Sequence, residues 1–245
     1  SDVCSSDLAV LRYDKRTFKY PEDCKKLLDA DNFTLNDETV SDAIAALNEV
    51  KTVLAIDSNK VFVAGHSLGA MAAPEIAKNC NVKGVIILAG NSRPVEDLIL
   101  EQTEYLASLN TQAADAKQQI DQVKTQVLNV KSLSKESDID PWQLPLSLPK
   151  NYWLYLNNYN QCNIAKSLAQ PILIIQGGRD CQVTMTDFNL WKKNLAGKSN
   201  VQFKQYDKLN HIFVEGTGKS TPAEYDKSGN VASYLIDDIA SFILK

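Results

Sequence analysis

The chain has 245 residues, of which 44% are hydrophobic, and this is enough for one substantial buried core. Its formal net charge is −4, and its lysines and arginines are scattered without a basic block, which excludes nucleic acid as a partner. We expect no membrane span, because no apolar run approaches the roughly 20 residues that cross a bilayer.

The cysteines predict neither a disulfide framework nor a metal site. They are odd in number and irregularly spaced, and they form no C-x-x-C pair and no zinc-ligand pattern: Cys4, Cys24, Cys80, Cys162 and Cys181. Nothing in the sequence indicates a cofactor, and none is predicted.

The first 54 residues are expected to hold one strand and one helix. Residues 1–7 carry no signal-peptide features, and we interpret them as a non-native or disordered leader. Residues 8–13 read as the first strand and residues 15–33 as a polar loop. Asn36 then caps a helix predicted over residues 37–54, whose apolar side chains recur on one face.

The most informative motif lies between an apolar run at residues 61–64 and a helix predicted over residues 70–78. It reads Gly65-His66-Ser67-Leu68-Gly69. The pattern G-x-S-x-G between a strand and a helix is typical of a nucleophile elbow, a strained turn that exposes the serine hydroxyl. We expect both glycines to be required, because side chains there would collide where the strand folds back against the helix.

A continuous apolar run over residues 82–88 predicts a central parallel strand that is buried on both faces. Strand alternation then stops, and we assign residues 92–163 to a helical cap inserted into a core formed by residues 8–91 and 164–245. Spacings of three and four predict one helix with a heptad seam in the cap, formed by Leu106, Leu109, Ala113, Ala116, Ile120, Val123, Val127 and Val130. The seam either packs on the body or a neighbouring helix, or joins two copies as a homodimer.

Aromatic residues gather where the predicted cap ends, among them Trp142, Tyr152 and Trp153. On a cap that faces a serine nucleophile, they would line an apolar pocket for an acyl group or an alcohol. Alternatively, they anchor the cap to the core. The sequence leaves both roles open, and each can hold for different residues.

A serine nucleophile needs a base, and the chain has only two histidines. The side chain of His66 should diverge from that of its neighbour Ser67 around the turn. This leaves His211 as the base, in the loop after a strand predicted over residues 201–206.

A base also needs a carboxylate that fixes its tautomer. The best candidate is Asp180, which follows the apolar strand at residues 171–175. Asp207 is closer to His211 in sequence, but it lies at the end of the same strand, and we expect its side chain to point elsewhere. The order Ser, Asp, His, each after a strand, is expected when loops converge at the carboxyl edge of a parallel sheet.

The remaining segments complete an alternating α/β pattern. A helix begins at Thr184 or Thr186, runs to Leu195 and is closed by Gly197. A final amphipathic helix over residues 231–244 is expected to cover the sheet.

With these residues the chain resembles the α/β-hydrolase superfamily, and within it bacterial esterases and serine-aminopeptidase-like hydrolases with a helical cap. The resemblance rests on residues 65–69, on residues 172–180 and on Asn210-His211. In addition, Arg12-Tyr13-Asp14-Lys15-Arg16 is similar to the family's D-x-R segment. It implies an α/β fold with a mostly parallel sheet flanked by helices.

The resemblance also makes residues 8–13 the family's fourth strand. The earlier strands are then missing, and the chain is truncated at its amino terminus. The backbone N–H of Leu68 would be one donor of the oxyanion hole, and the loop that normally supplies the second donor would be absent.

The predicted function is hydrolysis of small carboxylic esters through an acyl-enzyme on Ser67, with His211 as general base and Asp180 as orienting acid. One alternative is a serine peptidase or acyltransferase of the same fold. Another is a non-catalytic hydrolase-fold protein that binds ligands or partners through the cap. The compartment is not predicted.

Overall fold

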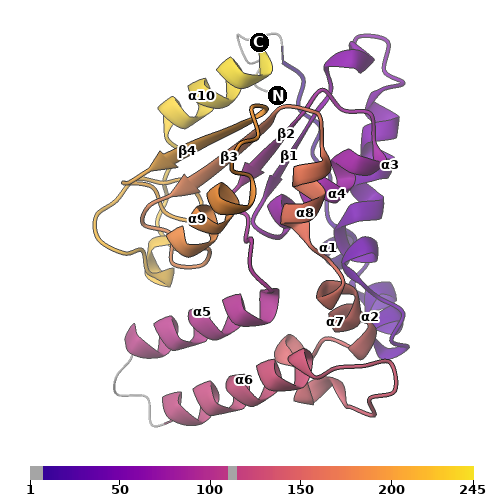
Figure 1. Cartoon of the computed structure of the whole chain (residues 1–245), viewed down its shortest axis with the longest axis vertical. Helices are drawn as coiled ribbons and strands as arrows, with labels where there is room; N and C mark the ends of the chain where they lie inside the picture. The colour runs from indigo at the N-terminus through magenta and orange to yellow at the C-terminus, as the bar shows by residue number, and fades with distance from the viewer. Residues whose placement is uncertain (1–7, 110–114) are drawn as a thin grey trace.

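The computed structural model describes residues 8–109 and 115–245, and within them a parallel sheet forms the centre of the molecule (Figure 1). The sheet has the order β1-β2-β3-β4, and each strand pairs in parallel with the next. The strands are β1 (Phe62–His66), β2 (Gly84–Leu88), β3 (Ile172–Gly177) and β4 (Val201–Tyr206). All four predicted strands from the nucleophile motif onward are therefore confirmed, with ends shifted by one or two residues.

Helices cover both faces of the sheet (Figure 1), as the predicted α/β pattern requires. One face carries α10 (Ser233–Ile243), whose residues Leu235 and Phe242 pack with Ile86 of β2 and Ile175 of β3. The opposite face carries three helices: α4 (Leu68–Asn79), α8 (Gln161–Ser167) and α9 (Met185–Asn194). The predicted carboxyl-terminal helix corresponds to α10 (Ser233–Ile243), and Gly197, at φ 78°, follows α9 as expected.

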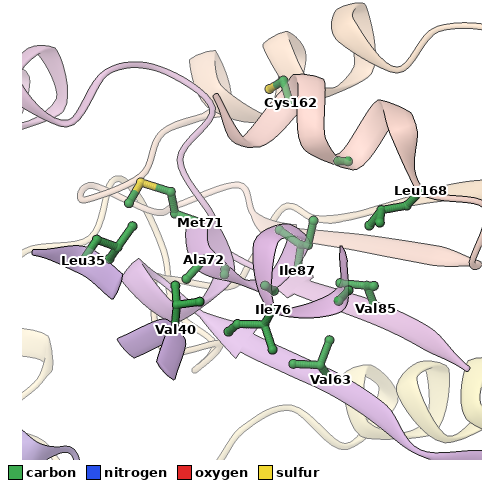
Figure 2. Packing of buried hydrophobic residues seen from close by; sticks show 14 of the residues in the cluster. Leu35, Val40, Val63, Met71, Ala72, Ile76, Val85, Ile87, Cys162 and Leu168 are labelled. Carbon is green, nitrogen blue, oxygen red and sulfur yellow. The ribbon is translucent and has the colours of Figure 1, made fainter. Parts of the chain in front are cut away.

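The main hydrophobic core lies between the strands β1 and β2 and the helices α4, α8 and α3 (Ser41–Val50). Figure 2 shows its packing seen from close by, with side chains from α4 beside those from the two strands and from the segment before α3. The labelled residues are Leu35, Val40, Val63, Met71, Ala72, Ile76, Val85, Ile87, Cys162 and Leu168. Because β2 is buried on both faces, it has the continuous apolar run by which it was predicted.

The predicted first strand is wrong. Residues 8–15 have no regular secondary structure, and the side chain of Val10 is 79% exposed. A strand needs a neighbour to satisfy its backbone groups, and in the described part of the chain β1 pairs only with β2. The predicted leader, residues 1–7, lies outside the described residues.

The segment predicted as a polar loop instead contains two short helices, α1 (Arg16–Lys19) and α2 (Pro21–Asp29). The following helix begins with a wide turn, η1 (Asn36–Val40), and continues as α3 (Ser41–Val50). It ends four residues before the predicted end, and the side chain of Leu54 is fully exposed at 103%. Asn36 makes no capping bond through its side chain; Asp37 instead accepts bonds from Thr34.

The prediction of a single helix with a heptad seam is also wrong. Two helices, α5 (Val95–Leu109) and α6 (Ala116–Lys131), lie side by side in a layer set apart from the sheet (Figure 1). Ala113 of the seam lies outside the described residues. Val127 and Val130 are buried, whereas Leu106 and Leu109 are about half exposed at 48% and 46%. A period of 3.5 residues is compatible with both arrangements, since it fixes a helical face and not where the chain reverses. The homodimer stays a prediction.

After α6 the chain returns to the core through short turns. They are the turns η3 (Pro141–Gln143) and η4 (Pro145–Ser147), followed by the helix α7 (Lys150–Asn157). Another short turn, η5 (Pro222–Glu224), lies between β4 and α10. None of the helices in the described ranges is both long and apolar enough to cross a membrane.

A buried ion pair joins the start of α5 to α9. Asp187 of α9 is fully buried, and its carboxylate accepts bonds from the backbone N–H groups of Ser92 and Arg93 and from the Arg93 guanidinium. Arg93 also pairs with Glu101 on α5. Breaking a buried pair of this kind leaves an uncompensated charge, so the entry to α5 is firmly fixed on the core.

Candidate active site

Ser67 stands at a strained turn between β1 and α4. Its backbone has φ 55° and ψ −118°, in the left-handed region that non-glycine residues rarely adopt. The turn is held by the Ser67 N–H, which donates to the carbonyl of Leu88 at 2.9 Å, and by the Ser67 carbonyl, which accepts from Ala70 and Met71 at 3.0 Å. The side chain is only partly buried. The predicted elbow geometry is therefore present.

The two glycines of the motif, Gly65 and Gly69, differ in the space that is available for a side chain. A Cβ at Gly65 would lie 2.1 Å from the carbonyl oxygen of Gly69, which no side chain can tolerate. A Cβ at Gly69 would meet nothing within 4 Å. The steric requirement predicted for both positions holds for Gly65 and is wrong for Gly69.

This difference predicts opposite effects of alanine at the two positions. Gly65→Ala should destabilise the fold by about 2 kcal/mol or more, because backbone atoms must move to admit the methyl group. Gly69→Ala, inside α4, should be neutral or stabilise the fold by up to about 1 kcal/mol, since alanine is the better helix former. Urea denaturation of the two variants measures both values; equal losses would contradict the steric explanation.

Asp180 and His211 form a buried pair. His211 Nδ1 lies 2.8 Å from Asp180 Oδ2, and the two side chains are 4% and 0% exposed. Asp180 lies in the turn after β3, and His211 lies in the loop after β4. Because β3 and β4 are adjacent and parallel, the turns at their carboxyl ends meet at one edge of the sheet.

Other groups hold the Asp180 carboxylate in place. Its Oδ1 accepts from the backbone N–H groups of Gln182 at 2.8 Å and Val183 at 3.0 Å, and its Oδ2 accepts from Gln176 Nε2 at 2.9 Å. Both oxygens therefore have donors, which leaves the orientation of the carboxylate little freedom. Asp207, the alternative carboxylate, is exposed and accepts a bond from Gln205 instead.

The nucleophile turn and the histidine loop lie against each other. His66 Nε2 lies 2.8 Å from the carbonyl oxygen of His211, and the two rings are 4.7 Å apart between centroids. The residue next to Ser67 in sequence is therefore in direct contact with His211. The prediction that the side chain of His66 turns away from Ser67 gave no sign of this contact.

Glu224 connects the two loops that carry Asp180 and His211. The guanidinium of Arg179 donates to Glu224 Oε1 at 2.6 Å, and Asn210 Nδ2 donates to Glu224 Oε2 at 3.3 Å. Arg179 precedes Asp180 and Asn210 precedes His211, so Glu224 joins the neighbours of both. Burial of Glu224 would raise the pKa of its carboxyl, but these hydrogen bonds outweigh it and hold the pKa below its ordinary value.

The lowered pKa of Glu224 predicts a pH-dependent contribution to stability. The carboxylate is stabilised in the folded state, so its contribution is complete above the ordinary pKa of about 4.5 and is lost as the pH falls through the lower folded pKa. Glu224→Gln should therefore lower Tm near neutral pH, and its difference from the wild type should shrink on acidification. Tm measured across the acid range checks this. Glu104→Gln, at an exposed ion pair on α5, is the control and should show no such convergence.

The three predicted aromatic residues do not share one environment. Tyr152 and Trp153 lie in the main core at 3% and 0% exposure, and the Tyr152 hydroxyl donates to Glu38. Trp142 is 65% exposed, and its indole N–H donates to Asp140. For Tyr152 and Trp153 the packing favours the anchoring alternative, and a role of the three residues in substrate binding stays a prediction.

Helix α5 covers the loops that carry the acid and the base. Gln102 Nε2 donates to the carbonyl of Gln182 at 2.9 Å, and the Tyr105 hydroxyl donates to the carbonyl of Ser220 at 2.7 Å. The predicted cap segment therefore lies over this edge of the sheet. Leu68, the predicted oxyanion donor, is the first residue of α4, and such N–H groups have no partner within their own helix.

Sequence reasoning missed the residues that support the pair. They are Gln176 within β3, Arg179 next to Asp180, Asn210 next to His211, and Glu224 in the segment after β4. The one signal was position: two of them, Arg179 and Asn210, adjoin the acid or the base in sequence. Nothing in the sequence indicated that Glu224 would meet them, because that contact depends on how the loop after β4 folds.

Comparisons with known proteins agree with this architecture. The model of the Alpha/beta hydrolase family matches residues 3–224, and the chain belongs to this family. It is 38% identical over 243 residues to Esterase EstD of Thermotoga maritima, an alignment that covers 99% of this chain and 55% of that protein. The chain thus spans about half the length of this curated relative.

Among solved structures, the chain is similar to Est1E from Butyrivibrio proteoclasticus. The TM-score is 0.51 at 15% identity, and the match covers 86% of this chain and 70% of that chain. At this identity the similarity concerns the fold alone, and it agrees with the parallel sheet flanked by helices.

Proposed function

We propose that this chain is a serine esterase that hydrolyses small carboxylic esters through an acyl-enzyme on Ser67. The observation that carries the proposal is the buried Asp180–His211 pair at 2.8 Å, in a loop that contacts the strained turn bearing Ser67. The similarity to a relative named as an esterase supports the same class of reaction.

The mechanism assigns one role to each side chain. His211 takes the proton of the Ser67 hydroxyl as the oxygen attacks the ester carbonyl, and Asp180 stabilises the resulting imidazolium. His211 then returns the proton to the departing alcohol. In the second half, His211 activates a water molecule that cleaves the acyl-enzyme.

The negative oxygen of the tetrahedral intermediate requires hydrogen-bond donors. We assign one of them to the N–H of Leu68, at the start of α4, where the helix dipole also favours negative charge. One such donor is worth about 10²–10³ in rate.

Two measurements on the purified chain test the proposal. A fluorophosphonate probe should label Ser67 covalently, and mass spectrometry of the peptide that contains Ser67 identifies the site. Short p-nitrophenyl esters should be hydrolysed faster than aminoacyl p-nitroanilides. Faster anilide turnover would favour the peptidase, and absence of labelling and turnover would favour a non-catalytic binding protein.

A further inference from the structure

His66 occupies an unusual place for a residue that the ester mechanism does not use. It is the last residue of β1 and the direct neighbour of Ser67, and its Nε2 lies 2.8 Å from the carbonyl oxygen of His211. A carbonyl oxygen can only accept a hydrogen bond. Nε2 of His66 therefore carries the proton, and this nitrogen is not free to act as a base toward Ser67.

The contact between the two histidines extends beyond this hydrogen bond. Their ring centroids lie 4.7 Å apart with the planes tilted by 48°, and the ring of Phe213 meets His66 edge-on at 5.9 Å. The imidazole of His66 thus packs against the loop that carries His211, although the residue as a whole is exposed. A hydrogen bond together with ring packing fixes both the position and the tilt of that loop.

The loop that carries His211 is also held by hydrogen bonds within the loop. The Asn210 side-chain oxygen accepts from the N–H groups of Ile212 at 3.1 Å and Val214 at 3.0 Å, and Phe213 N–H donates to the carbonyl of Asn210 at 3.0 Å. A stiff loop moves as one body. A contact at the His211 carbonyl therefore sets where the whole imidazole stands.

The bond to Asp180 holds the His211 ring at a single atom, Nδ1. This bond by itself does not fix how far the ring lies from Ser67. His66 holds the backbone of His211 at a second point. Because His66 and Ser67 are joined by a peptide bond, this second point is fixed relative to the nucleophile.

We propose that His66 is a positioning residue that ties the backbone of His211 to the nucleophile turn through its Nε2–H. The proposal rests on the proposed function, since it assigns His66 a role in aligning the base with Ser67. A displacement of about 1 Å between reacting groups can cost about 10²-fold in rate. Loss of the tie should therefore lower kcat while leaving KM nearly unchanged.

Two variants of similar volume separate the hydrogen bond from the packing. In His66→Gln the amide nitrogen can reach the position of the imidazole Nε2 and donate to the same carbonyl, whereas His66→Met has no donor. We expect the Met variant to lose about 10- to 100-fold in kcat for p-nitrophenyl acetate and the Gln variant to recover most of it. The two variants should melt at similar temperatures. Equal kcat in the wild type and the Met variant would overturn the proposal.

A second measurement needs no turnover. The chain has two histidines, so proton–nitrogen NMR of the imidazoles gives two resolvable ring patterns, and the His66→Gln spectrum assigns them. We expect the neutral Nε2–H form for His66, and a shift of the His211 ring signals in the Met variant. An Nδ1–H form for His66, or unchanged His211 signals in the Met variant, would overturn the proposal.

The two measurements also distinguish the proposal from the proposed function. If the wild type neither reacts with a fluorophosphonate nor hydrolyses the ester, the esterase assignment fails. The NMR result then decides by itself whether His66 positions His211.

Discussion

Ser67→Ala is expected to lower kcat for short p-nitrophenyl esters by at least about 10⁴-fold. In the proposed mechanism the Ser67 oxygen forms the covalent bond to the acyl group, and no other group in the mechanism can replace it. Removal of the nucleophile from a serine hydrolase costs up to about 10⁶-fold in kcat, with the remainder due to binding and oxyanion donors. Steady-state kinetics with active-site titration of the wild type measures this loss.

The Ser67→Ala variant must keep its fold for this result to be informative. Alanine has nearly the same backbone preferences as serine at φ 55°, so the strained turn is no less compatible with it and Tm should change little. Ser167→Ala is the matched control, because the hydroxyl of Ser167 bonds only to the carbonyl of Ile164 in its own helix. It should retain full turnover. A Ser67→Ala enzyme with wild-type turnover would remove Ser67 from the mechanism.

Asp180→Asn should produce the second large loss, about 10⁴-fold in kcat. The Oδ1 position can keep its two backbone donors, from Gln182 and Val183. The other position would become an amide N–H that faces two donors, His211 Nδ1 and Gln176 Nε2. The imidazole must then adopt the other tautomer, which places the proton on Nε2 and removes the base.

Asp207, the second carboxylate near the base, provides a control. Asp207 lies four residues before His211, and Asp207→Asn should leave kcat unchanged, because this exposed side chain bonds to Gln205. The pH profile of kcat/KM provides a further check, since its acidic limb should be altered in Asp180→Asn alone. Equal losses in the two variants would show that the choice of Asp180 is wrong.

Local signals predicted the sheet well. The strands β2 and β3 are buried on both faces, so their sequences are continuous apolar runs, and this pattern predicts buried strands without the structure. The turn at Ser67 was equally clear, because Gly65 is dictated by a backbone contact only four residues away. These features depend on neighbours close in sequence.

The predictions that were wrong concern features that depend on residues distant in sequence. Residues 8–13 have the composition of a strand, yet they form none, because a strand exists only where a partner offers its backbone. The heptad spacing from Leu106 to Val130 was real, but the point at which the chain reverses between α5 and α6 was not encoded in that period. Tyr152 and Trp153 had two equally good interpretations until packing placed them in the core.

By itself, the sequence determined the four strands of the sheet, the helices α4, α9 and α10, the serine turn and the identity of the acid and base candidates, since each has a local pattern. Only the tertiary structure decided that Asp180 meets His211, that Glu224 braces both loops and that His66 binds the His211 backbone. Such contacts join residues that are 14 to 145 positions apart. They are set by how the sheet and loops pack, for which short stretches of sequence carry no signal.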